Sequence, residues 1–151
     1  MNTKTIITIE SVIDEWKIDS IIDQSKLDTA LISTPSLHSK YLGYYTYFKQ
    51  RLAATESKRN KIGWQKRKYF RGEMDKSDLD KHGWSQWNGL KPSSTELNQL
   101  LEYDQDMNNL NQVVAEFKTA VAACEYILGQ IKYRDSALKT LVDYMKFVGG
   151  G

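Results

Sequence analysis

Residues 107–145 read MNNLNQVVAEFKTAVAACEYILGQIKYRDSALKTLVDYM and carry the longest regular pattern in the chain. From Leu100 to Met145, apolar side chains recur at alternating steps of three and four residues, and only Asp135 interrupts them. A seven-residue repeat sustained over about six repeats is typical of helices that pack on other helices, as in a coiled coil. The stretch therefore predicts a long C-terminal helix within residues 96–147.

This heptad seam is long and wide for one short chain to cover, so we expect it to join several copies of the chain in a homo-oligomeric ring or bundle. Cys124 belongs to the seam and is expected to be a small buried hydrophobic residue. Asp135 needs a cationic partner, for which Lys132, Arg134 and Lys139 are candidates. The expected oligomerisation residues are Leu110, Val114, Phe117, Val121, Cys124, Leu128, Ile131, Leu138 and Val142.

The segment before this helix lacks a period. Residues 73–95 are rich in Asp, Gly, Lys and Ser and are expected to form a loop, held down by Trp84 and Trp87. Ser93 and Glu96 then have the spacing of a capping box, which marks a helix start. His82 is expected to lie on the surface.

Residues 1–72 predict further helices. The first eight residues are expected to fray or to form a short strand, and a short helix follows over residues 10–17, after which Asp23 or Ser25 is expected to cap the next segment. A long helix is expected to begin at Pro35 and to run to Phe70. Its apolar seam ends at Leu52, so its second half is expected to lack a packing partner and to face a ligand.

Composition agrees with an all-α fold of long helices. The chain has 151 residues and only two prolines, and turn signals typical of β-proteins are few. No apolar run approaches the ~20 residues of a membrane span, and the N-terminus lacks a signal-peptide pattern. With one cysteine, the chain is expected in a reducing cytoplasm.

Basic residues are concentrated in the second half of the expected long helix. Residues 57–72, SKRNKIGWQKRKYFRG, hold seven basic residues and no acid. The whole chain carries +2 and this stretch +7, so the rest carries −5. Cations follow phosphates, and interleaved rings offer faces on which unpaired bases stack. The predicted nucleic-acid-binding residues are Lys58, Arg59, Lys61, Trp64, Lys66, Arg67, Lys68, Tyr69, Phe70 and Arg71.

The same run could instead be a solvated helix face, although exposed helices usually mix both signs of charge. Gly63 could mark a bend or an early helix end before Lys66. The cations from Lys66 to Lys68 are expected to contribute to binding and not to hold the fold. Trp64 could either stack on a base or pack.

Catalytic motifs are lacking in the sequence. There is no phosphate-binding glycine loop, no zinc-ligand spacing and no nucleophile with a suggestive histidine partner. The carboxylates at Asp75, Asp78 and Asp80 match no calcium loop, so a nuclease built on them is the weakest alternative. We expect no enzyme, no metal and no cofactor.

Several short motifs, in this order, resemble the UvsY-type recombination mediators of tailed (T-even-like) phages. They are Ile22-Asp23-x-Ser25-Lys26-Leu27, Ser39-Lys40-Tyr41-Leu42, Tyr69-Phe70-x-Gly72 and Ile131-Lys132-x-Arg134-x-x-Ala137-x-Lys139. In that family a basic-x-basic pair precedes the aromatic pair. Here Lys66 matches its second member, and Trp64 stands at the first.

The resemblance implies a helical ring of hexamer or heptamer size that binds single-stranded DNA. It also implies a mediator that helps a RecA-like recombinase displace single-strand-binding protein, in phage recombination, repair and recombination-dependent replication. The alternative is a coiled-coil scaffolding or adaptor protein that does not bind DNA directly. The expected organisation is a DNA-binding region over residues 1–72, a loop over 73–95 and an oligomerisation helix or helices over 96–147.

Overall fold

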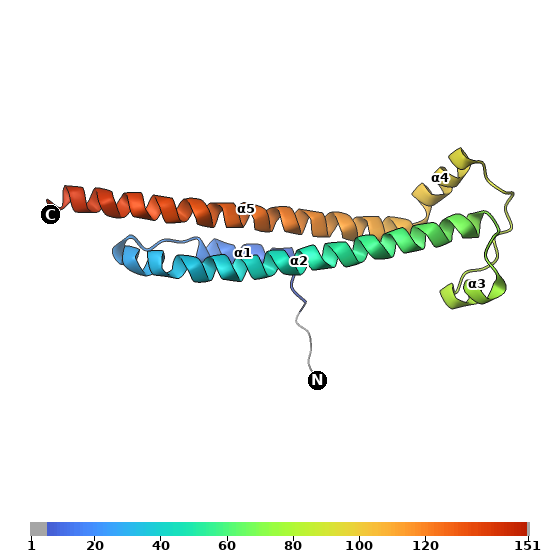
Figure 1. The fold of residues 1–151 in the computed structure, drawn as a ribbon, viewed down its shortest axis with the longest axis horizontal. Coiled ribbons are helices and arrows are strands. Elements are labelled where there is room, and N and C mark those ends of the chain that lie inside the picture. Colours follow the sequence, from blue (N-terminus) through green and yellow to red (C-terminus); the bar gives the residue numbers. More distant parts are fainter. Residues whose placement is uncertain (1–5, 151) are drawn as a thin grey trace, which may run out of the picture. The chain divides into compact units, whose positions relative to one another are not determined.

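The computed structural model describes residues 6–150 and contains only helices and their connections within that range. The elements are α1 Ile9–Asp19, the 3-10 turn η1 Gln24–Lys26, α2 Leu27–Phe70, α3 Lys76–His82, α4 Ser94–Tyr103 and α5 Gln105–Val148 (Figure 1). The predicted all-α class is confirmed. Of the strand considered for residues 1–8, residues 1–5 lie outside the described part, and residues 6–8 form no regular element.

The chain divides into two compact units. Met1–Lys49 and Lys118–Gly151 form one, called the terminal unit here, and Gln50–Phe117 form the other, the middle unit. α2 and α5 have 44 residues each and contribute to both units. The terminal unit therefore combines two segments far apart in the sequence, whereas the middle unit is one continuous segment.

α2 begins earlier than the sequence suggested. The Asp23 carboxylate accepts a hydrogen bond from the Ser25 amide at 2.9 Å and caps the turn η1, which leads directly into α2 at Leu27. The expectation of a start at Pro35 was wrong, because Pro35 lies inside the helix. The Ser33 and Thr34 hydroxyls donate to the Ala30 carbonyl just before the proline.

The core of the terminal unit lies between α1, α2 and α5. α2 and α5 are antiparallel, because Leu27 packs with Leu138 while the Tyr45 hydroxyl reaches the Glu125 carboxylate at 3.5 Å. Val12 of α1 is fully buried. A helix that touches two neighbours needs the wide apolar stripe seen in α5.

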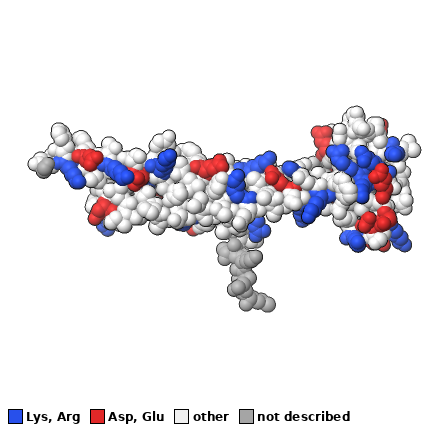
Figure 2. Space-filling model, in the orientation of Figure 1, with Lys and Arg blue, Asp and Glu red and all other residues white. Residues whose placement is uncertain are grey.

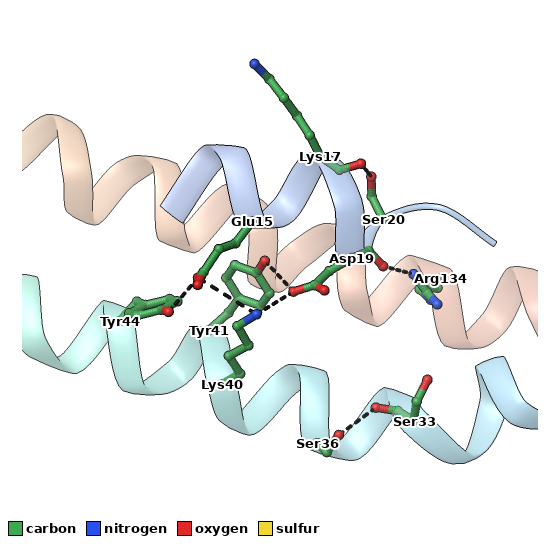
Figure 3. Close-up of polar contacts among 10 residues, drawn as sticks. All are labelled: Glu15, Lys17, Asp19, Ser20, Ser33, Ser36, Lys40, Tyr41, Tyr44 and Arg134. Atoms are coloured by element: carbon green, nitrogen blue, oxygen red, sulfur yellow. Dashed lines mark hydrogen bonds and ion pairs between the residues drawn. The ribbon is translucent and has the colours of Figure 1, made fainter. Parts of the chain in front are cut away.

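Polar contacts join these three helices at one edge of the core (Figure 3). The Asp19 carboxylate accepts hydrogen bonds from Lys40 Nζ at 2.7 Å and from the Tyr41 hydroxyl at 2.8 Å. Arg134 Nη1 donates to the Asp19 carbonyl at 2.7 Å. The end of α1 is thereby tied to both long helices by charged hydrogen bonds, which are stronger than neutral ones.

The middle unit holds the two short helices. The predicted loop over residues 73–95 contains α3, which the Asp75 side chain caps by accepting from the Asp78 amide at 2.8 Å. α3 ends at Gly83, whose φ of +67° is a left-handed conformation that suits glycine. The predicted capping box is confirmed at the start of α4, where Ser93 and Glu96 bond to each other's amides.

The C-terminal seam is not carried by one helix. α4 ends at Tyr103 and α5 begins at Gln105, with Asp104 in an extended conformation between them. Asp104 caps α5 by accepting a hydrogen bond from the Met107 amide at 3.0 Å. The expectation of an uninterrupted seam from Leu100 was therefore wrong, because Leu100 and Tyr103 belong to α4 and the later seam positions belong to α5.

Candidate nucleic-acid interface

The basic stretch forms the last turns of α2. The helix continues past Gly63 without the early stop considered above, and it ends at Phe70, two residues before Gly72, whose φ is +71°. The Gly72 amide donates to the Tyr69 carbonyl and the Glu73 amide to the Lys68 carbonyl, both at 3.0 Å. These two bonds form a Schellman cap, so the basic side chains project from a helix with a fixed end.

Lys66 is not an exposed cation, contrary to expectation. Its side chain is buried, with Nζ 3.1 Å from Asp104 Oδ1 and 2.9 Å from Asp106 Oδ2. Burial opposes its charge, but the hydrogen bonds to Asp106 and Asp104 outweigh that cost, and the pKa of Lys66 is raised. Lys66 therefore holds α2 to the junction of α4 and α5, and the expectation that it does not support the fold was wrong.

The sequence pattern did not predict that two acidic residues pair with Lys66. Asp104 and Asp106 lie 38 and 40 residues after Lys66, beyond any local charge pattern. A signal was present, because Asp104 precedes Met107 at the spacing of a helix N-cap. The apparent continuity of the heptad seam concealed this signal.

Tyr69 and Phe70 pack within the middle unit. Phe70 is buried, with its ring centre 5.0 Å from that of Trp87, and Tyr69 lies 5.4 Å from Trp84. The Tyr69 hydroxyl donates to the Ser85 carbonyl at 2.6 Å. The predicted anchoring of residues 73–95 by Trp84 and Trp87 is confirmed, and these contacts occupy the two rings expected to be base platforms.

Lys66 and His82 complete this aromatic cluster around Trp84. Lys66 Nζ lies 4.2 Å from the centre of the Trp84 ring, a cation–π arrangement. His82 stacks on the same indole with a centroid separation of 4.3 Å. His82 is thus partly covered by Trp84 and partly exposed.

Trp64 differs from the other rings of the stretch. Its side chain is 60% exposed, and Lys68 Nζ lies 3.8 Å from the ring centre. An exposed indole beside a cation has the composition of a base-stacking platform in single-strand-binding proteins. Of the alternatives left open for this residue, packing in the core is contradicted.

Six cations of the stretch remain available to a polyanion. None of these six side chains makes an ion pair with another of the described residues 6–150. Figure 2 shows basic side chains together with acidic ones in the region where α2 ends and where α3 and α4 lie. Six of the seven positive charges in residues 57–72 are therefore not neutralised by an acidic side chain within the part of the chain that the structure describes. They are Lys58, Arg59, Lys61, Arg67, Lys68 and Arg71.

The expected oligomerisation seam is covered largely by the chain itself. Val114, Val121, Cys124, Ile131 and Leu138 are buried within a single chain, and the remaining four positions are partly buried. Burial also raises the pKa of the Cys124 thiol to about 11, as expected for a seam hydrophobe. The Asp135 carboxylate pairs with Lys139 Nζ at 3.1 Å, which confirms one of its three expected partners.

Two further properties concern residues 6–150 only. No group of three or more His, Cys, Asp or Glu side chains there is arranged to hold a metal ion. Among the same residues, no helix combines the length and the apolar character needed to cross a bilayer.

Comparisons with known proteins agree with this architecture. Residues 15–151 match the family model described as "Recombination, repair and ssDNA binding protein UvsY". Crystal structures of the bacteriophage T4 recombination mediator protein UvsY share the fold. The structure in lattice type II superposes on this chain with a TM-score of 0.81 at 22% sequence identity, and the match covers 95% of this chain and 99% of that chain. The structure in lattice type I gives a TM-score of 0.78 at 22% sequence identity, and the match covers 91% of this chain and 98% of that chain.

No curated protein sequence matches the chain. The family match rests on nearly the whole length of the chain, including both long helices and the basic end of α2. The chain belongs to the UvsY family of recombination, repair and single-stranded-DNA-binding proteins.

Proposed function

We propose that the chain binds single-stranded DNA through the exposed side of the last turns of α2. The observation that carries the proposal is the set of six basic side chains without acidic partners, combined with the exposed Trp64. The cations neutralise phosphates, and the indole supplies a face for an unpaired base. Lys66 and Phe70, which are buried, and Tyr69, which is partly buried, support this surface from behind and do not form part of it.

A salt titration tests the proposal. Binding of a fluorescent oligothymidylate is measured by anisotropy for the wild type, Arg67→Ala and Lys68→Ala. Each lost phosphate contact should reduce the slope of log affinity against log salt by about 0.7. Lys17→Ala removes an equal charge from the exposed face of α1 and is the matched control. Wild-type affinity and slope in both α2 variants would favour the scaffolding alternative.

We further propose that the bound chain loads a RecA-like recombinase onto DNA covered by single-strand-binding protein. Membership of a recombination mediator family supports this role. The test is a reconstituted strand-exchange reaction with cognate recombinase and saturating single-strand-binding protein. The mediator should shorten the lag before exchange, and Arg67→Ala combined with Lys68→Ala should lengthen it again. An unchanged lag at every ratio of mediator to DNA would reject the role.

We also propose a homo-oligomer, of hexamer or heptamer size, formed through an exposed stripe of α5. Tyr126, Tyr133 and Tyr144 are all largely exposed in the single chain. Their spacings of 7 and 11 residues correspond to about two and three helical turns, so the three rings share one face. Exposed aromatic residues on one face are typical of protein interfaces.

Light scattering tests this assembly. Tyr133→Glu should reduce the mass of the species, since it places a charge within the stripe. Lys146→Glu places the same carboxylate on another face of α5 and should leave the mass unchanged. A wild-type chain that is monomeric at micromolar concentration would exclude the oligomer, and an unchanged mass for Tyr133→Glu would exclude this stripe as its interface.

A further inference from the structure

A groove of about 410 Å³ lies in the middle unit between α2, α4 and the first turns of α5. Gly63 and Met107 line its apolar part. A Cβ atom on Gly63 would lie 3.3 Å from Met107 Cε, so the absence of a side chain there keeps this part of the groove open. The volume falls within the range of small-molecule sites, roughly 300–1,000 Å³.

The groove is bordered by groups that suit a nucleotide. Trp64 lines it with its exposed indole, and Arg59 and Arg67 line it from the same helix. The two arginines are eight residues apart, about 12 Å along the helix axis, with Trp64 between them. A chain of phosphates can therefore contact both arginines while the intervening base meets the indole.

The polar side chains of the groove suit a base edge better than a phosphate. Asn60, Asn98 and Asn111 offer amide donors and acceptors, and Glu102 offers a carboxylate. An asparagine amide can both donate to and accept from a base edge, and a carboxylate accepts from a ring N–H such as that of thymine or from an amino group such as that of cytosine. The negative charge of Glu102 repels a phosphate, which leaves the uncharged base as the part of the nucleotide that fits.

We propose that this groove accepts one unstacked base of the bound strand, with its face on Trp64 and its edge on the asparagines and Glu102. The neighbouring phosphates lie on Arg59 and Arg67. The inference rests on the proposed single-stranded-DNA binding and deepens it, because it adds a base-contacting site to a phosphate-contacting surface. Duplex DNA, whose bases are stacked and paired, cannot supply such a base without local opening.

Two oligonucleotides of equal length distinguish the contribution of the base to binding from that of the phosphates. One is oligothymidylate, and the other has the same sugar-phosphate chain with abasic sites. Asn98→Trp, from an exposed position on α4, would fill the groove with a ring. It should weaken oligothymidylate binding by roughly five- to a hundredfold, the range for loss of one stacked base. Abasic binding and both salt slopes should stay as in the wild type.

The neighbouring residue provides the matched control. Gln99 lines a different groove, so Gln99→Trp adds the same ring to α4 on another side. It should bind both oligonucleotides as the wild type does, and circular dichroism should show the same helix content in both variants. Equal oligothymidylate affinity for Asn98→Trp and wild type would overturn the proposal.

A second measurement needs no variant. Oligothymidylate carrying 4-thiothymidine is crosslinked by light to the wild-type chain, and the modified peptides are identified by mass spectrometry. Crosslinks at Trp64 or Met107 are expected. Crosslinks found only outside the groove would overturn the base site while leaving the proposed DNA binding intact. Failure of the wild type to bind either oligonucleotide would instead reject the proposed function and this inference with it.

Discussion

Lys66 on α2 and Asp104 between α4 and α5 form a nearly buried ion pair, with Nζ 3.1 Å from Oδ1 and side-chain exposures of 8% and 11%. Asp104 uses its other carboxylate oxygen to cap α5 through the Met107 amide. The Asp104 carboxylate therefore caps the start of α5 and also neutralises Lys66, which belongs to α2. The pair separates the basic stretch into one structural cation and six that are free to bind.

Lys66→Ala should lower the free energy of unfolding by about 3 kcal/mol. Removing one partner leaves Asp104 buried without its cation, at a cost of about 3–5 kcal/mol, and the half-exposed Asp106 places the effect at the lower end. Arg67→Ala removes an exposed cation and should change stability by no more than about 0.5 kcal/mol. Urea denaturation followed by circular dichroism measures both, and equal stabilities would contradict the structural role.

Trp64→Ala should weaken single-stranded-DNA binding by about 1–3 kcal/mol per stacked base and leave the salt slope unchanged. The indole contributes a face and no charge, so counterion release is the same without it. Trp64→Phe keeps a smaller ring and should lose less affinity. Anisotropy titrations at several salt concentrations distinguish the two effects. A reduced slope for Trp64→Ala would mean that the substitution disturbs the cations instead.

The same substitution at two glycines should have opposite effects. Gly43 lies inside α2 with no other atom near its missing Cβ, so Gly43→Ala should stabilise the protein by up to about 1 kcal/mol. Gly72 has a φ of +71°, where an added Cβ is strained, so Gly72→Ala should destabilise it by about 1 kcal/mol. Melting temperatures that move in the same direction would argue against the cap at the end of α2.

Asp19 should make the protein sensitive to acid. Burial raises the pKa of Asp19, but its hydrogen bonds to Lys40 and Tyr41 outweigh this, and the pKa is lowered below 3.8. Its contribution to stability is therefore present above pH 3.8 and is lost as the pH falls through the folded-state pKa. Asp19→Asn should be less stable at pH 7 and show a weaker loss below pH 4. Urea midpoints between pH 7 and pH 2 test this.

Cys124 should resist thiol reagents in the folded protein. Its side chain is fully buried, and burial raises the pKa of the thiol to about 11, so little reactive thiolate exists near neutral pH. Labelling at pH 7.5 should be slow in buffer and fast in denaturing urea. The ratio of the two rates reports the opening of the terminal unit. Rapid labelling in buffer would contradict the burial of Cys124 in the folded chain.

Local features of the fold could be predicted from the sequence. The capping box at Ser93, the Asp23 cap and the helical periodicity of α5 each depend on residues a few positions apart. Their energies arise within one or two helical turns, so neighbouring residues determine them. The basic character of the end of α2 is likewise a property of consecutive residues.

Only the tertiary structure decided which residues of the stretch are available to a ligand. Lys66 is neutralised by Asp104 and Asp106, and Tyr69 and Phe70 are covered by Trp84 and Trp87. Those partners come from segments 15 to 40 positions away in the sequence. Whether a charge or a ring is free depends on what lies near it in space, and the fold brings those partners together. The sequence by itself determined the helical character and the charge of this surface, whereas the packing of α2 against the α4–α5 junction decided which side chains it exposes.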